Sequence, residues 1–265
     1  MKKYINKYKK EGFCVIRNFI PKKLLKECLS YIKNHKDLGE KKLNSIINLP
    51  LFHFVKGIDK QDSPFMKILK INKLASFSKL LNIKNIQYLY PRCYTKPSWY
   101  GPAQHYHQEF YYNKKYGYKM QKNEYFLMFM ALNKHNEDNG CLRVIPYSHK
   151  MGVLKHTQFV NKDLFEDSRI TIEAMDKCYK RYGIYKCNLN AGDCVIFHPL
   201  TIHGSTTNST LSNRKTFSTG ITSLKFIDSY DENNKKRLKY VKKRKNFVIN
   251  VLKKRLKVLQ SIKNY

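Results

Sequence analysis

The 265-residue sequence is poor in acidic residues. Nineteen aspartates and glutamates stand against 52 lysines and arginines, a formal net charge of +33 at pH 7. Such a charge favours association with anions of many kinds. Two interpretations stay open: an anionic partner, such as nucleic acid or a membrane surface, or a lysine-rich composition that only loads solvent-exposed faces. Lysine far outnumbers arginine and is spread along the chain, which favours the second interpretation, because specific nucleic-acid recognition relies on arginine forks.

The sequence also lacks paired cysteines and long apolar runs. Its seven cysteines are odd in number and scattered, without a Cys-x-x-Cys pair, so neither a zinc knuckle nor a disulfide framework is indicated. No window approaches the roughly 18 apolar residues that span a bilayer. The basic segment 1–8 is not followed by the apolar run of a signal peptide. We therefore expect a soluble, cytoplasmic protein with reduced cysteines.

Apolar spacing predicts several helices, most of them in the first third of the chain. In residues 21–35 apolar side chains recur at helical spacing and Pro21 suits the first turn, so this segment reads as an amphipathic helix whose stripe serves packing. Residues 114–122 read as a polar loop. The expected helices are 3–11, 21–35, 63–73, 74–81, a segment around 164–180, and 231–265.

Short apolar or alternating runs separated by turns predict strands, and their number argues for a sandwich or barrel. Pro91 interrupts one run and predicts an edge or a bulge there. The run 125–132 is continuously apolar, which is typical of a strand buried on both faces. Residues 137–140 predict a turn of the Asn-Gly type. The expected strands are 13–18, 85–94, 104–112, 125–132, 141–145, 194–197 and 215–224.

We expect one large domain, residues 1–230, followed by a basic helical extension, residues 231–265. Thirteen basic side chains lie between Lys235 and Lys263, and apolar residues recur on one face of the same segment. This extension could bind a membrane or nucleic acid, but docking onto the barrel by its apolar stripe is favoured.

Two stretches far apart in the sequence contain side chains that bind metals. His107 and Glu109 are two positions apart in the first, and His203 lies in the second, with Arg214 eleven residues further on. Two histidines and one carboxylate form the ligand set of non-haem iron(II) oxygenases, which leaves one face of the metal open for cosubstrate and oxygen. His105 and His198 lie close enough to the proposed ligands for a rival triad.

The surrounding residues resemble the phytanoyl-CoA dioxygenase (PhyH-like) family of iron(II)/2-oxoglutarate-dependent oxygenases. One motif alone is weak, since a His-x-acid triplet is frequent by chance, but four motifs in order are specific. The resemblance covers roughly residues 8–225. The motifs are Glu11-Gly12-Phe13-Cys14-Val15-Ile16, His107-Gln108-Glu109 with Tyr112, the segment 139–150, and 192–197 running into His203-Gly204-Ser205, Asn208 and Arg214.

The resemblance implies a double-stranded β-helix, a jelly-roll or cupin-like barrel that is mainly β, with helices outside one sheet. It implies metal ligation by His107, Glu109 and His203. Arg214 would bind the distal carboxylate of 2-oxoglutarate with its guanidinium fork, assisted by the hydroxyl of Ser205. His107 and Glu109 would point to one side of their strand or its end and Gln108 to the other.

Several residues near these motifs receive weaker assignments. His105 is expected to line the pocket or bond a neighbour, and His198 to be structural. Gln104, Trp99 and Tyr112 could contact substrate or only pack.

The sequence departs from the family pattern at two positions. Glu109 replaces the usual aspartate; it is one methylene longer but still offers an oxygen ligand, and its presence argues against a halogenase. Tyr147 replaces the glycine common in a Pro-Gly-Ser-His turn, which puts the shape of that loop in doubt.

The resemblance implies an enzyme that uses iron(II), 2-oxoglutarate and O2 to hydroxylate a C–H bond of a small organic substrate, releasing succinate and CO2. One alternative is a nucleic-acid-directed oxygenase of the same cofactor class, which the net charge favours. Another is a non-catalytic binding protein on the same barrel. No residue pattern identifies the substrate, because variable loops form the pocket of this fold.

Overall fold

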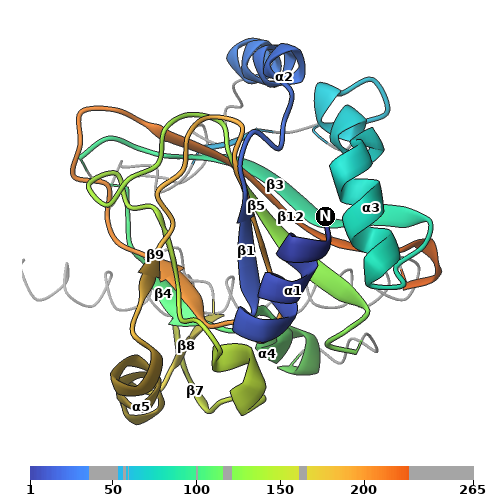
Figure 1. Cartoon of the computed structure of the whole chain (residues 1–265). Helices are drawn as coiled ribbons and strands as arrows, with labels where there is room; N and C mark the ends of the chain where they lie inside the picture. The colour runs from blue at the N-terminus through green and yellow to red at the C-terminus, as the bar shows by residue number, and fades with distance from the viewer. Residues whose placement is uncertain are drawn as a thin grey trace, which may run out of the picture.

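Two antiparallel sheets form the body of the protein (Figure 1). The computed structural model describes residues 1–35, 53–55, 58, 60–99, 101–115, 121–160 and 166–226. The larger sheet contains, in spatial order, β1 (Phe13–Ile16), β10 (Cys194–Phe197), β5 (Tyr125–Ala131), β12 (Arg214–Ser223), β3 (Ile86–Lys96) and β2 (His53–Val55). The smaller sheet contains β4 (Gln104–His107), β11 (His203–Ser205), β6 (Leu142–Val144) and β9 (Tyr185–Lys186).

The central strand β5 is buried on both faces, as its continuous apolar run predicts. Side chains alternate along a strand, so Phe126 and Met128 pack into the cluster on the outer face of the larger sheet. Leu127 and Phe129 point the other way, into a second cluster that also contains residues of the smaller sheet. The inner cluster is therefore the core between the two sheets.

Helical segments cover the outer face of the larger sheet (Figure 1). The predicted helix 63–73 is a 3-10 helix that begins where predicted, because Ser63 caps it by accepting a hydrogen bond from the Phe65 amide. Its C-cap is Ile71, which also precedes the first residue of the next helix. These segments are α1 (Lys2–Glu11), α2 (Lys22–Asn34), η2 (Pro64–Lys70) and α3 (Asn72–Leu80).

The prediction of a bulge at Pro91 is confirmed. Strand β3 pairs with β12 on both sides of this residue, but the register shifts between Ser218 and Gly220. Tyr90 there has a φ of 44°, which is an unusual backbone conformation for a bulky side chain. The proline lacks the amide proton that continuous pairing would need.

The prediction of an extended segment through Tyr112 is wrong. Strand β4 ends at His107, opposite the first residue of β11, so the residues that follow have no strand to pair with. Their backbone groups are satisfied in helix α4 (Glu109–Lys115) instead, and the amide of Phe110 donates to the Pro199 carbonyl.

Two other segments differ from expectation. The helix expected around 164–180 begins later, as α5 (Ile172–Tyr182), because Thr171 caps it and the preceding residues form β8 (Glu166–Ile170). That strand pairs with β7 (His156–Val160) in a separate two-stranded sheet. The turn at 137–140 connects β5 in one sheet with β6 in the other. Most of the predicted polar loop 114–122 and the whole extension 231–265 lie outside the described residues.

Tyr147 occupies a position that favours glycine. Its φ is 62°, in the left-handed region, where a residue without a Cβ meets no steric penalty. Its amide donates to the Glu11 carbonyl at 2.7 Å, and its ring contacts Tyr182, with the two centroids 5.7 Å apart. The turn thus keeps the left-handed conformation with a tyrosine in it.

Among the residues described, no helix is both long and apolar enough to cross a membrane.

Acid should destabilise the fold through His135. This side chain is 1% exposed, its Nε2 lies 2.9 Å from the Lys215 carbonyl, and burial, with Arg214 nearby, lowers its pKa from 6.5 to about 3. Between these values the unfolded chain binds a proton that the folded chain does not. The stability contributed by neutral His135 is therefore present above about pH 6.5 and lost as the pH falls towards 3, by up to about 1.4 kcal/mol per pH unit.

Urea unfolding of the metal-free protein at a series of pH values checks this. The substitution His135→Gln should flatten the loss of stability below pH 6.5, whereas His105→Gln, at an exposed position, should not. Parallel pH profiles for wild type and His135→Gln would contradict the assignment.

Candidate active site

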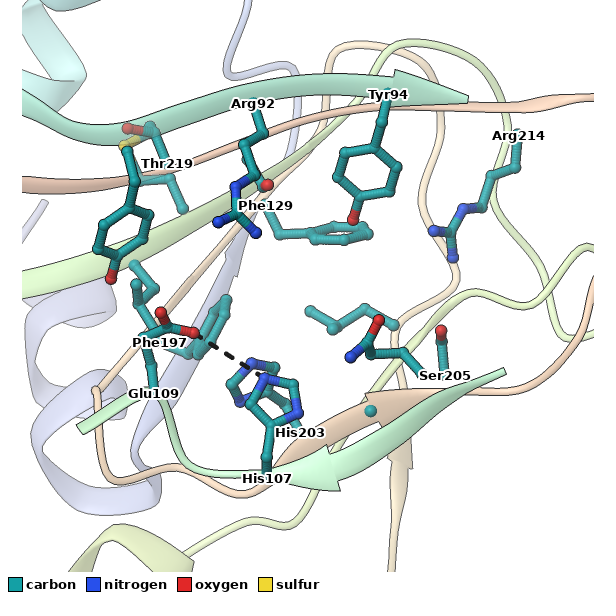
Figure 2. Close-up of a pocket in the computed structure, with 17 residues that line it drawn as sticks. Arg92, Tyr94, His107, Glu109, Phe129, Phe197, His203, Ser205, Arg214 and Thr219 are labelled. Atoms are coloured by element: carbon teal, nitrogen blue, oxygen red, sulfur yellow. Dashed lines mark ion pairs between the residues drawn. The ribbon is translucent and has the colours of Figure 1, made fainter. Parts of the chain in front are cut away.

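A cavity of about 200 Å³ lies between the two sheets. Strands β3, β5 and β12 supply one wall and β4 and β11 the other (Figure 2). His107, His203 and Glu109 meet at one end of it, whereas Ser205 and Arg214 lie at the other (Figure 2). The structure thus brings together the five residues that the resemblance assigns to metal and cosubstrate binding.

The two histidines are cross-strand neighbours. In the antiparallel pairing of β4 with β11, His107 lies directly opposite His203, and directly opposed residues point to the same face of a sheet. The ring centroids are 4.2 Å apart, and both residues are 7% exposed.

Backbone carbonyls orient both imidazole rings. The Nδ1 atom of His107 lies 2.7 Å from the carbonyl of His105, and that of His203 lies 3.0 Å from the carbonyl of Thr201. A carbonyl can only accept, so each Nδ1 carries the proton and each Nε2 keeps its lone pair. Burial, and then the neighbouring His107, hold the pKa of His203 well below its usual value. The His203 ring is therefore neutral, as metal ligation requires.

Glu109 is the first residue of helix α4, just after β4. Its Oε2 lies 3.9 Å from Nε2 of His107, and one ligand atom from each of the three residues lies within 4.8 Å of the others. That spacing, with two imidazole nitrogens and one carboxylate oxygen, fits a single divalent transition-metal ion with coordination positions left open.

Gln108 points away from the cavity, as expected, and it is completely buried. Its amide nitrogen donates to the carbonyls of Leu200, at 2.7 Å, and Gly152, at 2.9 Å. Its amide oxygen accepts from the Leu154 amide at 2.8 Å. One side chain thereby fixes the strand with His107 against the loop that precedes His203.

A bulge decides which residues of β4 face the cavity. His203 pairs with His107, but Ser205 pairs with Gln104, so β4 has one more residue than β11 over this interval. Gln104 and His107 consequently both line the cavity, while His105 is exposed. The expectation that His105 lines the pocket is wrong, although its carbonyl does bond His107.

Of the other residues with weaker assignments, one lies beside the histidines and two lie outside the cavity. His198 accepts a hydrogen bond from the Leu200 amide at 3.1 Å and contacts Tyr8 with its ring, which is a structural role. Tyr112 places its ring edge-on to His107, with centroids 5.7 Å apart. Trp99 is 66% exposed and does not line the cavity.

Arg214 lies at the opposite end of the cavity from the histidines and is 1% exposed. One guanidinium nitrogen donates to the Gly140 carbonyl, and the guanidinium carbon lies 5.5 Å from the ring centroid of Phe129. No described residue forms an ion pair with it. A buried arginine without a carboxylate partner is costly, and the carboxylate of a bound ligand would supply one.

Lys96 is a second buried basic side chain at this end, and the sequence did not reveal it. It is completely buried, and its ammonium donates to Oγ of Ser205 at 2.8 Å and to the Thr206 carbonyl. Gly140 makes room for it: a Cβ there would lie 2.9 Å from the lysine Nζ. Burial, and then Arg214, lower the pKa of Lys96 to about 6, and a bound anion would raise it again.

Lys96 determines how Ser205 can act. A serine hydroxyl has one proton to donate. Because the Lys96 ammonium donates to Oγ, that proton can be directed at a ligand in the cavity. The sequence contains only a weak indication of this role, because Lys96 is one of many lysines. Its even spacing from Arg92 and Tyr94 along β3 indicates only that the three side chains share one face of the strand.

A jelly-roll of two facing antiparallel sheets, with a His-Glu-His cluster inside it and a buried arginine beyond, is the fold and site of the iron(II)- and 2-oxoglutarate-dependent oxygenases. Residues 8–216 match the family model described as "Phytanoyl-CoA dioxygenase (PhyH)". The chain belongs to this family, as its motifs predict.

Known proteins agree with this placement. A "Probable phytanoyl-CoA dioxygenase" of Caenorhabditis elegans is 34% identical over 88 residues, which cover 33% of this chain and only 27% of that protein.

Solved structures share the fold. The structure of EctD from S. alaskensis with 2-oxoglutarate and 5-hydroxyectoine is 18% identical, with a TM-score of 0.67 over 85% of this chain and 77% of that one. The 2-oxoglutarate complex of EvdO2 from Micromonospora carbonacea var. aurantiaca is 16% identical, with a TM-score of 0.60 over 84% of this chain and 91% of that one.

Replacement of Lys96 by methionine should weaken 2-oxoglutarate binding about tenfold or more, because Ser205 loses the donor that orients it and the site loses a charge-assisted hydrogen bond. Titration calorimetry of the Mn(II)-loaded protein measures the affinity. Lys215→Met is the matched control, since Lys215 follows Arg214 on β12 and points to the opposite side. Unchanged affinity in a folded Lys96→Met protein would remove Lys96 from the site.

Proposed function

We propose that this protein is an iron(II)- and 2-oxoglutarate-dependent dioxygenase that hydroxylates a C–H bond of a small organic substrate, with release of succinate and CO2. The observation that carries the proposal is that one cavity contains a His-Glu-His set at one end and, at the other, a buried arginine with no ion-pair partner among the described residues. A metal alone would not need Arg214, and a dicarboxylate alone would not need the three ligands.

His107, Glu109 and His203 would hold the metal through two Nε2 atoms and a carboxylate oxygen. When bound, iron(II) and 2-oxoglutarate supply the oxygen-activating chemistry, in which decarboxylation of the cosubstrate is coupled to oxidation of the substrate. The contribution of the protein is to hold these groups in place. The carbonyls of His105 and Thr201 keep both rings in the ligating tautomer, as second partners of histidine ligands commonly do.

Arg214, Ser205 and Lys96 would bind the distal carboxylate of 2-oxoglutarate. A guanidinium fork suits a carboxylate, and the low polarity around it strengthens the attraction. Phe129, Leu142 and Phe197 also line the cavity and would exclude water from the bound cosubstrate.

Glu109 reaches the histidines from the start of a helix rather than from a strand. The additional methylene relative to aspartate lets the carboxylate extend back towards His107 from this position. This supports a glutamate as the third ligand.

The nucleic-acid alternative receives less support from the arrangement of charge. The lysines of α1 and α2 lie on helices that cover the outer face of the larger sheet, whereas the candidate site lies between the sheets. These lysines thus lie away from the cavity.

Anaerobic titration with iron(II) and then 2-oxoglutarate should produce the charge-transfer absorption of a chelated cosubstrate, and air should then give succinate. His107→Ala should abolish both signals. His105→Ala is the control, because it removes a histidine two residues away that faces solvent.

Failure of the wild-type protein to bind iron would leave the non-catalytic binding protein as the better description. Demethylation of a modified oligonucleotide, with an affinity that falls steeply with salt, would instead favour the nucleic-acid enzyme.

A further inference from the structure

Arg92 lies on β3 and lines the cavity from the wall opposite the histidines. Its guanidinium points into the cavity, between Tyr94 and the end at which Glu109 lies (Figure 2). It forms no hydrogen bond or ion pair with any residue in the described part of the chain. The sequence assigned it no role, and neither metal nor cosubstrate binding, as proposed above, uses it.

Arg92 and Arg214 differ in their surroundings. Arg214 is completely enclosed, but Arg92 is exposed, so it lies where the cavity opens to solvent. Both influence Tyr94: burial raises the pKa of its hydroxyl, and Arg214 and then Arg92 oppose that rise. The two arginines thus mark the closed and the open part of one cavity, with Tyr94 between them (Figure 2).

The charges in the cavity would not balance if it held a divalent metal ion and 2-oxoglutarate. Among the lining residues, Arg92 and Arg214 are cations and Glu109 is the carboxylate. Together with a divalent ion, the arginines supply four positive charges, and Glu109 and 2-oxoglutarate supply three negative ones. One positive charge is left over, and a protonated Lys96 would add to it.

The excess charge points to the substrate rather than to the cosubstrate. Both carboxylates of 2-oxoglutarate have partners in the proposed function: the distal one has Arg214, Ser205 and Lys96, and the other would chelate the metal. Arg92 is therefore the cation without an assigned anion, and it lies where the cavity opens to solvent.

We propose that Arg92 determines substrate specificity by binding an anionic group, a carboxylate or a phosphate, of the organic substrate. The guanidinium fork holds such a group in two parallel hydrogen bonds, and this fixes the rest of the molecule between the arginine and the metal end. The enzyme then acts on organic anions. This inference rests on the proposed function, because it takes the metal and cosubstrate positions from it.

Pairs of compounds that differ only in charge test the proposal. The probes are hexanoate with hexanamide and benzoate with benzamide, added to protein loaded with Mn(II) and 2-oxoglutarate. Broadening of the ligand proton signals by Mn(II) reports both affinity and closeness to the metal. In the wild-type protein each carboxylate should bind about tenfold or more tightly than its amide, since hydrogen bonds to charged groups are the strong ones.

Arg92→Gln should abolish this preference while leaving the affinities for Mn(II) and 2-oxoglutarate within about twofold of wild type. Arg181→Gln is the matched control: it removes the same charge from an exposed position on α5, outside the cavity, and should keep the preference. This control distinguishes specific binding of an anion by Arg92 from the non-specific attraction of anions to a protein with a net charge of +33.

Three results would overturn the inference. They are a wild-type protein that does not prefer the anions, an Arg92→Gln protein that still does, and an Arg92→Gln protein that loses 2-oxoglutarate affinity, which would assign Arg92 to the cosubstrate. Failure of the proposed function is seen separately, as absence of Mn(II) and 2-oxoglutarate binding in the wild-type titration that precedes the probes.

Discussion

The pairing of β11 with β4 is the interaction on which the site depends. It brings His107 and His203, which are far apart in the sequence, into directly opposed positions whose side chains share one face. Backbone carbonyls from the same two segments then orient both rings. Gln108 fastens the pair from behind by bonding the loop before His203. Because the strand pairing holds the two stretches in register, a shift in that register would displace both histidines relative to each other.

The bulge in β4 and the end of that strand at His107 explain how the other residues near the two histidines are oriented. The bulge in β4 lets Gln104 and His107 face the cavity and turns His105 outward. The end of the strand at His107 leaves the next residues without a partner, so the chain forms helix α4 and presents Glu109 from its first turn. The departure from aspartate is therefore consistent with a backbone that changes direction just before Glu109.

Electrostatics organise the opposite end. Arg214 and Lys96 are both completely enclosed, and Arg214 lies close enough to lower the pKa of Lys96; no carboxylate of the described residues forms an ion pair with either. Such an arrangement is stable only if the backbone supplies acceptors, and the carbonyls of Gly140 and Thr206 do so. The protein thereby keeps a cationic pocket ready for an anion, at a cost in its own stability.

Local pattern and motif order in the sequence determined the family, the jelly-roll class and the two-faced burial of β5, and they selected five candidate site residues that line one cavity, because these depend on alternation, spacing and residue chemistry along short segments. The directions of His105, Arg92 and Lys96, the helical start at Glu109 and the left-handed turn at Tyr147 depended on the tertiary structure. The physical reason is that a side chain in a strand faces the side that pairing with distant residues assigns to it. A single bulge or an early strand end, neither of which has a reliable signal in the segment itself, reverses that assignment.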